Sequence, residues 1–417
     1  MSANTFEPSL GSTSGKQVEP VPKGKHIAVI GAGAFGGWTA LHLRQNGYTV
    51  TLVDAWGPGN SRSSSGDETR VIRSTYGANE FYFDLNVRAL QLWKEYEQRW
   101  SKKLFQNKGV LWLCYQEHTP LVDDSIPFAE KHNMPYERLS TTELNKRFPL
   151  INSADLHHAY YDSFGGCLRA REACQLVQKA FVEAGGNYIQ AFAKPGKIEH
   201  DRLTGIQLST GTTLEADAYI FACGSWLGKL FPEVLGQVIT CTKQEVYYFG
   251  VPADHAQALD SMPVWVDVDG EDFYYGIPGN QQRGFKIGVD KRGEKFDPTH
   301  GDRIANPEVL AKARKFIAHR FPALANAPVV ESRVCPYENS PDGNFIFDQH
   351  PEAANIFFMG GGSGHGFKHG PAFGEMVANT VAGESSIHPY LILKDQLLPS
   401  FSRRGRHARS AGRGGLL

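Results

Sequence analysis

The stretch from residue 27 to residue 54 constrains the fold of this chain more than any other. It opens with a short apolar run, continues through a glycine-rich turn and an amphipathic segment of helical period, and closes with a second strand-like run and an aspartate. The glycines of the turn follow the spacing G-x-G-x-x-G at Gly31, Gly33 and Gly36. Strand, turn, helix and strand in this order predict a Rossmann-like unit that binds a dinucleotide.

Each residue of the motif has a physical reason. Gly31 permits the tight turn out of the strand, Gly33 lets the backbone approach a pyrophosphate, and Gly36 lets the helix pack closely on the sheet. Phe35 belongs to the same turn, at the helix N-terminus that attracts phosphate. Asp54 ends the second strand, where it can accept hydrogen bonds from ribose hydroxyls. An ordinary glycine turn is the alternative, and the stretch alone does not separate NAD from FAD.

Composition limits the class of protein. The chain has 417 residues, enough for two domains or one interleaved pair. Its 41% hydrophobic and 21% charged residues are typical of a soluble globular protein, and a formal net charge of -1 gives no field that would recruit nucleic acid. No apolar run approaches the roughly 18 residues of a membrane span. We therefore expect neither a nucleic-acid partner nor a membrane partner.

The six cysteines are scattered without C-x-x-C spacing, which argues against a zinc site and against a disulfide framework. A reducing compartment is the simpler interpretation, so we expect a cytoplasmic protein with no bound metal. Residues 1–24 lack the apolar segment of a secretory signal and are predicted to be a disordered leader. Residues 396–417 hold several arginines among small residues and are predicted to be a basic flexible tail, with an anion-binding arm as the alternative.

A long polar loop follows the second strand and ends in two arginines, Arg70 and Arg73. Its position past that strand places it on the cofactor side of an open α/β sheet. Its hydroxyls and amides suit a phosphate or the edge of a flavin, so we assign cofactor contacts to Ser64, Ser65, Thr69 and Arg70. A flexible serine linker is the alternative, but a linker is not expected to carry so many charged groups directly before a helix.

The remainder of the chain alternates helices with strand-rich segments. Residues 241–289 carry alternating or aromatic runs that predict an antiparallel sheet, suited to a substrate-binding region. Two later glycine turns, at residues 222–226 and 360–368, indicate that the chain returns to the nucleotide-binding part. Expected helices cover residues 80–100, 141–147, 169–184, 307–321 and 371–381.

The predicted fold class is α/β with mixed α+β character. We assign residues 25–80, 150–235 and 325–395 to a discontinuous nucleotide-binding domain, and residues 81–149 and 236–324 to a substrate domain. The two domains are therefore interleaved along the chain.

Four separated segments together resemble one family, the flavin-dependent amine oxidases of the monomeric sarcosine oxidase and N-methyltryptophan oxidase group, whose broader fold is shared with D-amino-acid oxidase. The segments are residues 27–54, the Ser-Gly-Asp-Glu-Thr-Arg-Val-Ile-Arg loop at 65–73, the Arg-Val-Cys-Pro-Tyr strand at 333–337 and the Ser-Gly-His-Gly-Phe-Lys turn at 363–368. Residues from about 26 to 395 look alignable in order. The resemblance implies FAD as cofactor and a Rossmann-like FAD-binding domain interleaved with an antiparallel-sheet substrate domain.

The resemblance also implies roles for single residues. Arg70 corresponds to a residue that packs near the flavin ring, and Arg73 and Lys368 to a pair that holds a substrate carboxylate. Lys286 corresponds to the lysine on the N5 side of the flavin, where a fixed positive charge favours electron transfer to oxygen. Tyr275 corresponds to an active-site tyrosine near the substrate. For the charged residues, surface ion pairs or solvent-facing side chains are the alternatives.

Cys335 stands where this family attaches its flavin covalently, through a thioether to the 8α-methyl carbon. Inert packing of a buried cysteine is the alternative. In the late glycine turn, the cofactor contacts implied by the resemblance are Gly362, Gly364, His365, Gly366 and Lys368.

Two residues depart from the sarcosine oxidase pattern. Asp290 stands where those enzymes carry a histidine four residues after the lysine, and Ser65 replaces a histidine that precedes Gly-Asp in the arginine loop. A gained carboxylate and a lost imidazole change the charge of the pocket. We therefore expect a substrate other than sarcosine, namely a larger amine with a second polar or cationic group bound by Asp290.

The predicted function is FAD-dependent oxidation of the carbon–nitrogen bond of an amino acid or a secondary amine, with molecular oxygen as acceptor and hydrogen peroxide as product. The imine then hydrolyses to a carbonyl compound. Two alternatives stay open: a dehydrogenase of the same fold that passes electrons to another acceptor, and a flavin-binding subunit without turnover. The resemblance implies a monomer.

Overall fold

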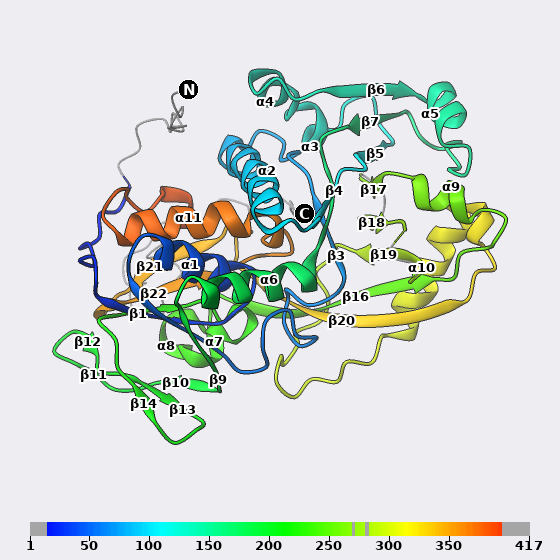
Figure 1. Ribbon diagram of the computed structural model, residues 1–417. Coiled ribbons are helices and arrows are strands. Elements are labelled where there is room, and N and C mark those ends of the chain that lie inside the picture. The colour runs from blue at the N-terminus through cyan, green and yellow to red at the C-terminus, as the bar shows by residue number, and fades with distance from the viewer. Residues whose placement is uncertain (1–14, 269–271, 280–282, 394–417) are drawn as a thin grey trace, which may run out of the picture.

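The strand that precedes the glycine motif, β1 (His26–Ile30), lies inside a six-stranded sheet in the computed structural model, which describes residues 15–268, 272–279 and 283–393 (Figure 1). The strand order is β21-β22-β15-β1-β2-β9. All neighbours are parallel except β21 and β22. The remaining strands are β2 (Thr49–Asp54), β9 (Asn187–Gln190), β15 (Ala218–Phe221), β21 (Ile346–His350) and β22 (Ala353–Gly360). The chain order reverses between β1 and β15, and open α/β sheets bind ligands at such a switch point.

The two faces of this sheet are covered by different elements, because side chains alternate along each strand. Ile27 and Val29 point into a core shared with four helices. These helices are α1 (Ala34–Gln45), α2 (Glu80–Trp100), α6 (Ala170–Glu183) and α11 (Gly370–Val381). Ala28 and Ile30 point into a second core on the opposite face. That face carries the short helices and strands α7 (Leu227–Leu230), α8 (Pro232–Leu235), β10 (Ala193–Pro195), β11 (Ile198–Glu199), β12 (Arg202–Leu203), β13 (Ile206–Leu208) and β14 (Thr213–Leu214).

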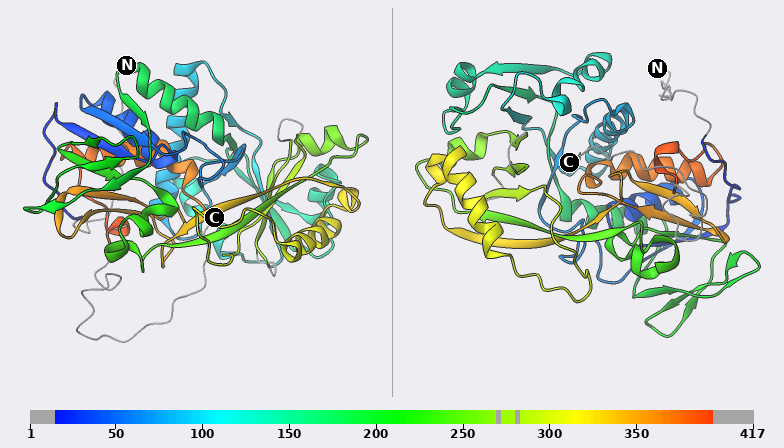
Figure 2. Two further views of the ribbon diagram at one scale, coloured as in Figure 1. Left: turned by 90° about the horizontal axis from the view of Figure 1, so that it is seen from below. Right: turned by 180° about the vertical axis from the view of Figure 1, so that it is seen from behind.

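A second sheet of eight strands forms the other lobe of the molecule (Figure 2). Its order is β20-β16-β19-β18-β17-β5-β7-β6. Its neighbours are antiparallel except β17 and β5, which pair in parallel, so the predicted antiparallel sheet is mixed at this one place. The strands are β5 (Val110–Cys114), β6 (Tyr136–Ser140), β7 (His158–Asp162), β16 (Thr240–Phe249), β17 (Val264–Asp267), β18 (Tyr274–Ile277), β19 (Phe285–Val289) and β20 (Val329–Asn339).

The strands β16 and β20 run from one lobe into the other and pair along their whole length (Figure 1). A small third sheet, built from β3 (Thr69–Ile72), β8 (Gly166–Arg169) and β4 (Phe105–Gln106), holds the arginine loop between the lobes. By hydrogen bonding, β7 and β20 belong to the eight-stranded sheet, although the sequence boundaries placed both in the nucleotide-binding domain. The chain crosses between the two sheets as many times as those boundaries imply, but two of the crossings come later, after β7 and after β20.

Several predicted helices are observed almost residue for residue. α2 covers 80–100 and α5 (Thr141–Arg147) covers 141–147, where Ser140 and Glu143 form a capping box. α10 (Pro307–Arg320) ends one residue before its predicted end, and Asn306 caps it. The helix of the glycine motif begins directly after Gly33, so it includes Phe35 and Gly36. Short helices that were not predicted are α3 (Pro120–Asp123), α4 (Ile126–Lys131) and α9 (Ala256–Ser261).

The described residues near the N-terminus are bound to the first lobe. Within the range predicted to be a disordered leader, the backbone of Lys16 exchanges two hydrogen bonds with Ile387, and Val21 N donates to Val381 O (2.9 Å). The tail predicted at 396–417 lies outside the described residues. In the part of the chain that the structure describes, no helix is both long enough and apolar enough to cross a membrane.

Candidate active site

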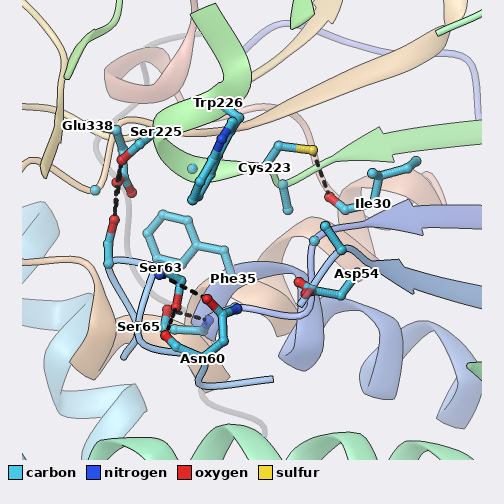
Figure 3. A pocket seen from close by; sticks show the side chains of 18 of the residues that line it. Ile30, Phe35, Asp54, Asn60, Ser63, Ser65, Cys223, Ser225, Trp226 and Glu338 are labelled. Atoms are coloured by element: carbon cyan, nitrogen blue, oxygen red, sulfur yellow. Dashed lines mark hydrogen bonds between the residues drawn. The ribbon is translucent and has the colours of Figure 1, made fainter. Parts of the chain in front are cut away.

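A pocket opens at the carboxyl ends of β1, β2 and β15, at the switch point of the six-stranded sheet (Figure 3). Four segments that are far apart in the sequence meet there: the glycine turn after β1, the polar loop after β2, the turn after β15 and the glycine turn after β22. The residues of the predicted cofactor set that line it are Gly31, Gly33, Phe35, Asp54, Ser64, Ser65, Arg70, Gly362, Gly364 and Gly366.

The other members of the predicted cofactor set do not line this pocket; they are Gly36, Thr69, Cys335, His365 and Lys368. Gly36 packs behind the turn against Gly31. His365 and Lys368 are buried near Tyr76, and Tyr76 Oη lies 3.0 Å from His365 Nδ1. The structure thus separates the pocket lining from a second, buried group of predicted residues.

The glycine turn has the shape that a pyrophosphate requires. A Cβ on Gly31, whose φ is 108°, would lie 2.3 Å from Ala222 O, and one on Gly36 would lie 2.0 Å from Gly31 O. Close packing of the turn therefore requires glycine at both positions. A Cβ on Gly33 would meet only the side chain of Ser65, with the hydroxyl at 3.1 Å, so this backbone is open on the pocket side. The residues present fit the pyrophosphate of FAD at the N-terminus of α1.

Asp54 lines the pocket and also holds the backbone around it. Its carboxylate accepts hydrogen bonds from Ala32 N (2.8 Å), Trp56 N (2.9 Å) and Gly57 N (2.7 Å). Burial raises the pKa of this carboxyl, and the three N–H donors oppose that shift. Asp54 therefore fixes both the glycine turn and the start of the polar loop.

An aromatic group on the pocket wall was not predicted. The ring centroid of Trp56 lies 4.9 Å from that of Phe192 and 4.9 Å from that of Trp226, and all three residues line the pocket. Trp226 is the last residue of the glycine turn predicted at 222–226, which was a usable signal. The sequence around Trp56 and Phe192 gave no such signal, because a single aromatic residue in a loop is more often part of a hydrophobic core.

Glu338, at the end of β20, is a second lining residue that sequence reasoning missed. Its carboxyl accepts hydrogen bonds from Ser64 Oγ (2.6 Å) and Ser225 Oγ (3.3 Å), and burial raises its pKa. A Cβ on Gly362 would lie 2.8 Å from Glu338 Oε1. This carboxyl therefore joins three of the four segments that form the pocket.

Arg70 and Lys286 meet at one carboxylate beside the pocket. Arg70 Nη1 donates to Asp67 Oδ2 (3.1 Å), and its Nη2 donates to Ser64 O (2.7 Å). Lys286 projects from β19, is 1% exposed, and donates to Asp67 Oδ2 and to Thr69 O (3.0 Å). The alternative of a strand lysine that faces water is therefore wrong for Lys286.

Arg73 and Lys368 both lie close to the ring of Tyr76. Arg73 Cζ is 4.3 Å and Lys368 Nζ 5.1 Å from the ring centroid of Tyr76. Arg73 Nη1 donates to Thr75 O, while its Nη2 is buried with no hydrogen-bond partner among the described residues. Lys368 Nζ donates to His365 O (3.1 Å), and burial together with Arg73 lowers the pKa of Lys368 well below its usual range. Two buried cations with donors to spare favour an anionic ligand.

Two carboxyl groups lie near this pair of cations. Burial raises the pKa of Asp290 to about 7, against the opposing attraction of Arg73 and Lys368. A Cβ on Gly364 would lie 3.2 Å from Asp290 Oδ1, so Asp290 borders the late glycine turn. Asp162, which was not predicted, is fully buried; burial raises its pKa to about 7, and its Oδ2 has no partner among the described residues.

Tyr275 and Cys335 lie on strands of the second sheet, on β18 and β20. The ring of Tyr275 covers Gly288, where a Cβ would lie 2.6 Å from it. Cys335 is 7% exposed, and burial raises the pKa of its thiol while Arg70 lowers it. None of the six cysteines, all of which the structure describes, forms a disulfide bond. Among the described residues, no group of three His, Cys, Asp or Glu side chains is placed to hold a metal ion.

Comparison with known proteins places these features in one family. The profile of the DAO family, described as FAD dependent oxidoreductase, matches residues 26–380. Monomeric sarcosine oxidase of Arthrobacter sp. (strain TE1826) is 28% identical over 372 residues, which cover 88% of this chain and 95% of that protein. N-methyl-L-tryptophan oxidase of Yersinia pestis (strain Pestoides F) is 26% identical over 355 residues, which cover 84% and 93%.

A solved structure shows the same fold. L-Proline dehydrogenase from P. horikoshii matches with a TM-score of 0.75 at 22% identity, covering 89% of this chain and 96% of that protein. This structure and the family profile confirm the predicted mixed α/β fold, and the family profile confirms the predicted FAD cofactor. Because the family profile spans most of the chain and the glycine turn fits its cofactor, the chain belongs to the DAO family of FAD-dependent oxidoreductases.

Proposed function

We propose that this protein is an FAD-dependent oxidase of the carbon–nitrogen bond of an amino acid or a secondary amine. The observation that carries the proposal is the buried cation pair, Arg73 and Lys368, whose spare donors suit a carboxylate near the dinucleotide pocket. Bound FAD would accept two electrons from the carbon–hydrogen bond beside the amine nitrogen, and molecular oxygen would then accept them to give hydrogen peroxide. The imine product hydrolyses in water.

The chain's own residues bind and orient the substrate in this proposal. Arg73 Nη2 and Lys368 Nζ hold the carboxylate, and the rings of Tyr76 and Trp112 exclude water from Arg73, whose Cζ lies 5.4 Å from the Trp112 ring centroid. Asp290 would bind a second, cationic group of the substrate, because it lies near Arg73 and Lys368 and has no ion pair with another described residue. A substrate with one anionic and two cationic groups matches this arrangement.

The sharpest test uses the holoenzyme without oxygen. A panel of secondary amino acids is mixed anaerobically with the protein, each beside the matched amine that lacks the carboxylate, and the visible flavin band is followed. We expect amino acids to bleach the band at concentrations where the matched amines do not. Equal bleaching by amino acids and amines would contradict the binding of a carboxylate by Arg73 and Lys368. No bleaching by any compound would favour a flavin-binding subunit without turnover.

We also propose that Cys335 attaches the flavin through an 8α-thioether. Cys335 is buried on β20 within the electrostatic reach of Arg70, a pocket-lining residue. After acid precipitation of the wild-type protein the yellow colour should remain with the pellet, whereas Cys335→Ala should release it to the supernatant. A pellet that stays yellow in Cys335→Ala would show that another residue forms the bond.

Oxygen as the acceptor and a monomeric state complete the proposal. Lys286 supports oxygen, because its buried side chain binds Asp67 and Thr69 in the same loop as Arg70, which lines the dinucleotide pocket. An oxygen-electrode trace during turnover tests the acceptor. A trace without oxygen consumption, from an enzyme whose flavin is bleached by substrate, would favour a dehydrogenase.

A further inference from the structure

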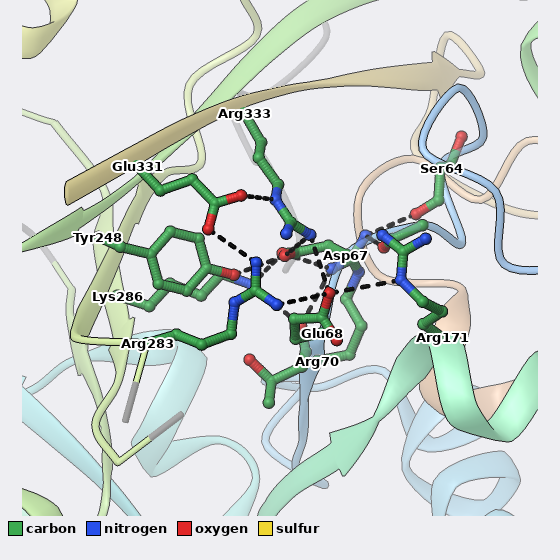
Figure 4. A network of polar contacts seen from close by, with 12 residues as sticks. Ser64, Asp67, Glu68, Arg70, Arg171, Tyr248, Arg283, Lys286, Glu331 and Arg333 are labelled. Atoms are coloured by element: carbon green, nitrogen blue, oxygen red, sulfur yellow. Dashed lines mark hydrogen bonds and ion pairs between the residues drawn. The ribbon is translucent and has the colours of Figure 1, made fainter. Parts of the chain in front are cut away.

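Four donors converge on the carboxylate of Asp67, beside the proposed flavin site (Figure 4). They are Lys286, Arg70, Arg333 and Tyr248, with Arg333 Nη1 at 3.1 Å from Oδ1. The side chain of Asp67 is 1% exposed. These contacts hold the pKa of this carboxyl far below its usual range although burial opposes them, so Asp67 stays ionised.

The backbone of Asp67 adopts a conformation that disfavours most side chains. Its φ is 81°, in the left-handed region where glycine is the easiest residue to place. The carbonyl accepts from Arg171 N (3.2 Å), which ties the residue to the start of α6. Three of the four donors project from β16, β19 and β20 of the other sheet. A buried charge kept in such a conformation indicates a need for the carboxylate itself.

Lys286 depends on that carboxylate for its charge. It is buried, and burial and Arg70 both lower the pKa of its amine, whereas Asp67 raises it. The other polar groups that face Lys286 are Thr69 O, Tyr248, Cys335 and Cys167, and none of them is a carboxylate. Without Asp67, the ammonium would lie buried next to cations with no counterion, and the neutral amine would be favoured.

We propose that Asp67 is a positioning residue that keeps Lys286 protonated and oriented toward the flavin, and that it thereby sustains the reaction with oxygen. The inference rests on the proposed function, in which the charge of Lys286 favours electron transfer to oxygen. Neither Asp67 nor Lys286 lines the dinucleotide pocket, but Arg70, which shares the carboxylate of Asp67 with Lys286, does. An ammonium has three N–H donors, and Asp67 and Thr69 accept two, which leaves the third for the flavin side.

The chain offers a matched control in the next residue. Glu68 also pairs with cations, with Arg333 Nη1 at 3.3 Å and Arg171 Nε at 3.3 Å, but it makes no contact with Lys286. Asp67→Asn and Glu68→Gln each remove one negative charge from the same loop. Asparagine also tolerates a positive φ, so Asp67→Asn keeps the backbone conformation.

The experiment measures oxidation of the reduced holoenzyme by oxygen, without any amine. The protein is reduced with light and EDTA and mixed with oxygenated buffer from about pH 6 to about pH 10, because burial lowers the pKa of Lys286 below that of an ordinary lysine. The rate constant should fall as pH rises through the pKa of Lys286. In Asp67→Asn this fall should move to lower pH by about one to three units, because an opposite charge in contact shifts a pKa by that much. Glu68→Gln should leave it in place.

Arg333→Gln gives a second measurement with the opposite sign. It removes a cation that shares Asp67 with Lys286, so the fall should move to higher pH, whereas general damage to the site would move both variants in the same direction. The flavin midpoint potential, followed by dye equilibration over the same pH range, reports the same ionisation without turnover.

The outcomes separate this inference from the proposed function. A wild-type protein that oxygen reoxidises slowly at every pH, no faster than Lys286→Met, would overturn both. Fast reoxidation that Lys286→Met slows and Asp67→Asn leaves unchanged in rate and pH profile would overturn the role of Asp67 alone. Should Asp67→Asn not fold, an unchanged or downward-shifted profile in Arg333→Gln would overturn it.

Discussion

The two close-packed glycines of the turn and the open one should respond differently to the same substitution. In Gly36→Ala the new methyl would lie 2.0 Å from Gly31 O and 2.9 Å from Ala222 Cβ. Gly31 O is a backbone atom and Ala222 Cβ is bonded directly to the backbone, so neither can turn aside and the turn itself has to move. Overpacking of this kind costs about 1–3 kcal/mol, and the better helix propensity of alanine offsets about 1 kcal/mol of it. Because a contact of 2.0 Å puts the overpacking at the upper end of that range, we expect the free energy of unfolding to fall by about 2 kcal/mol.

Gly37→Ala is the control in the same helix. A Cβ there would meet Val177 Cγ1 at 3.4 Å, an ordinary contact, so the substitution should be neutral or stabilise by up to about 1 kcal/mol. Gly33→Ala should lower stability by only about 1 kcal/mol, because alanine is a poorer N-cap residue than glycine. It should nevertheless weaken FAD binding at least tenfold, about 1.4 kcal/mol, since the methyl fills the space beside the pyrophosphate.

The assay uses proteins that also carry Cys335→Ala, so that FAD can be removed and returned. Urea unfolding of the flavin-free protein gives stability, and quenching of flavin fluorescence on titration gives affinity. The reasoning is refuted if Gly33→Ala binds FAD as tightly as the parent, or if Gly36→Ala and Gly37→Ala unfold at the same urea concentration.

Two further predictions concern the buried charges. Arg73→Gln should raise the KM for a carboxylate-bearing substrate by roughly 10- to 100-fold, the value of one charge-assisted hydrogen bond. Asp290→Ala should raise the KM only for substrates with a second cationic group. Steady-state kinetics with substrates that have and lack this group checks the prediction, and an equal rise in KM for the two kinds of substrate would contradict it. Asp162 has a folded-state pKa raised to about 7, so the folded protein binds more protons than the unfolded chain and wild-type stability should fall as pH rises from about 4 to about 7. Asp162→Asn keeps an oxygen that accepts from Phe164 N and Gly165 N but does not titrate. In urea unfolding, the stability of the variant relative to wild type should therefore rise by on the order of 2 kcal/mol between pH 5 and pH 8. A difference in stability that stays constant over this range would contradict the prediction.

Much of the first lobe follows from local patterns. The period of the apolar residues and the glycine spacing predict β1, α1 and β2, because each element is defined by neighbours within a few residues. The same holds for α5, whose capping box is contained in four consecutive residues, and for the polar loop that lines the pocket. The order of the strands and the parallel pairing of β17 with β5 are not local properties, and the sequence did not indicate that pairing.

By itself, therefore, the sequence determined the dinucleotide-binding unit and the identity of the charged residues near it. Only the tertiary structure decided which of them share a partner. Lys286 and Arg333 reach Asp67 because β19, β16 and β20 pair in one register, and Glu338 reaches Ser64 because β20 crosses between the lobes. A carboxylate becomes a common partner for several cations only when folding removes them all from water at one place, and no periodicity along the chain encodes that event.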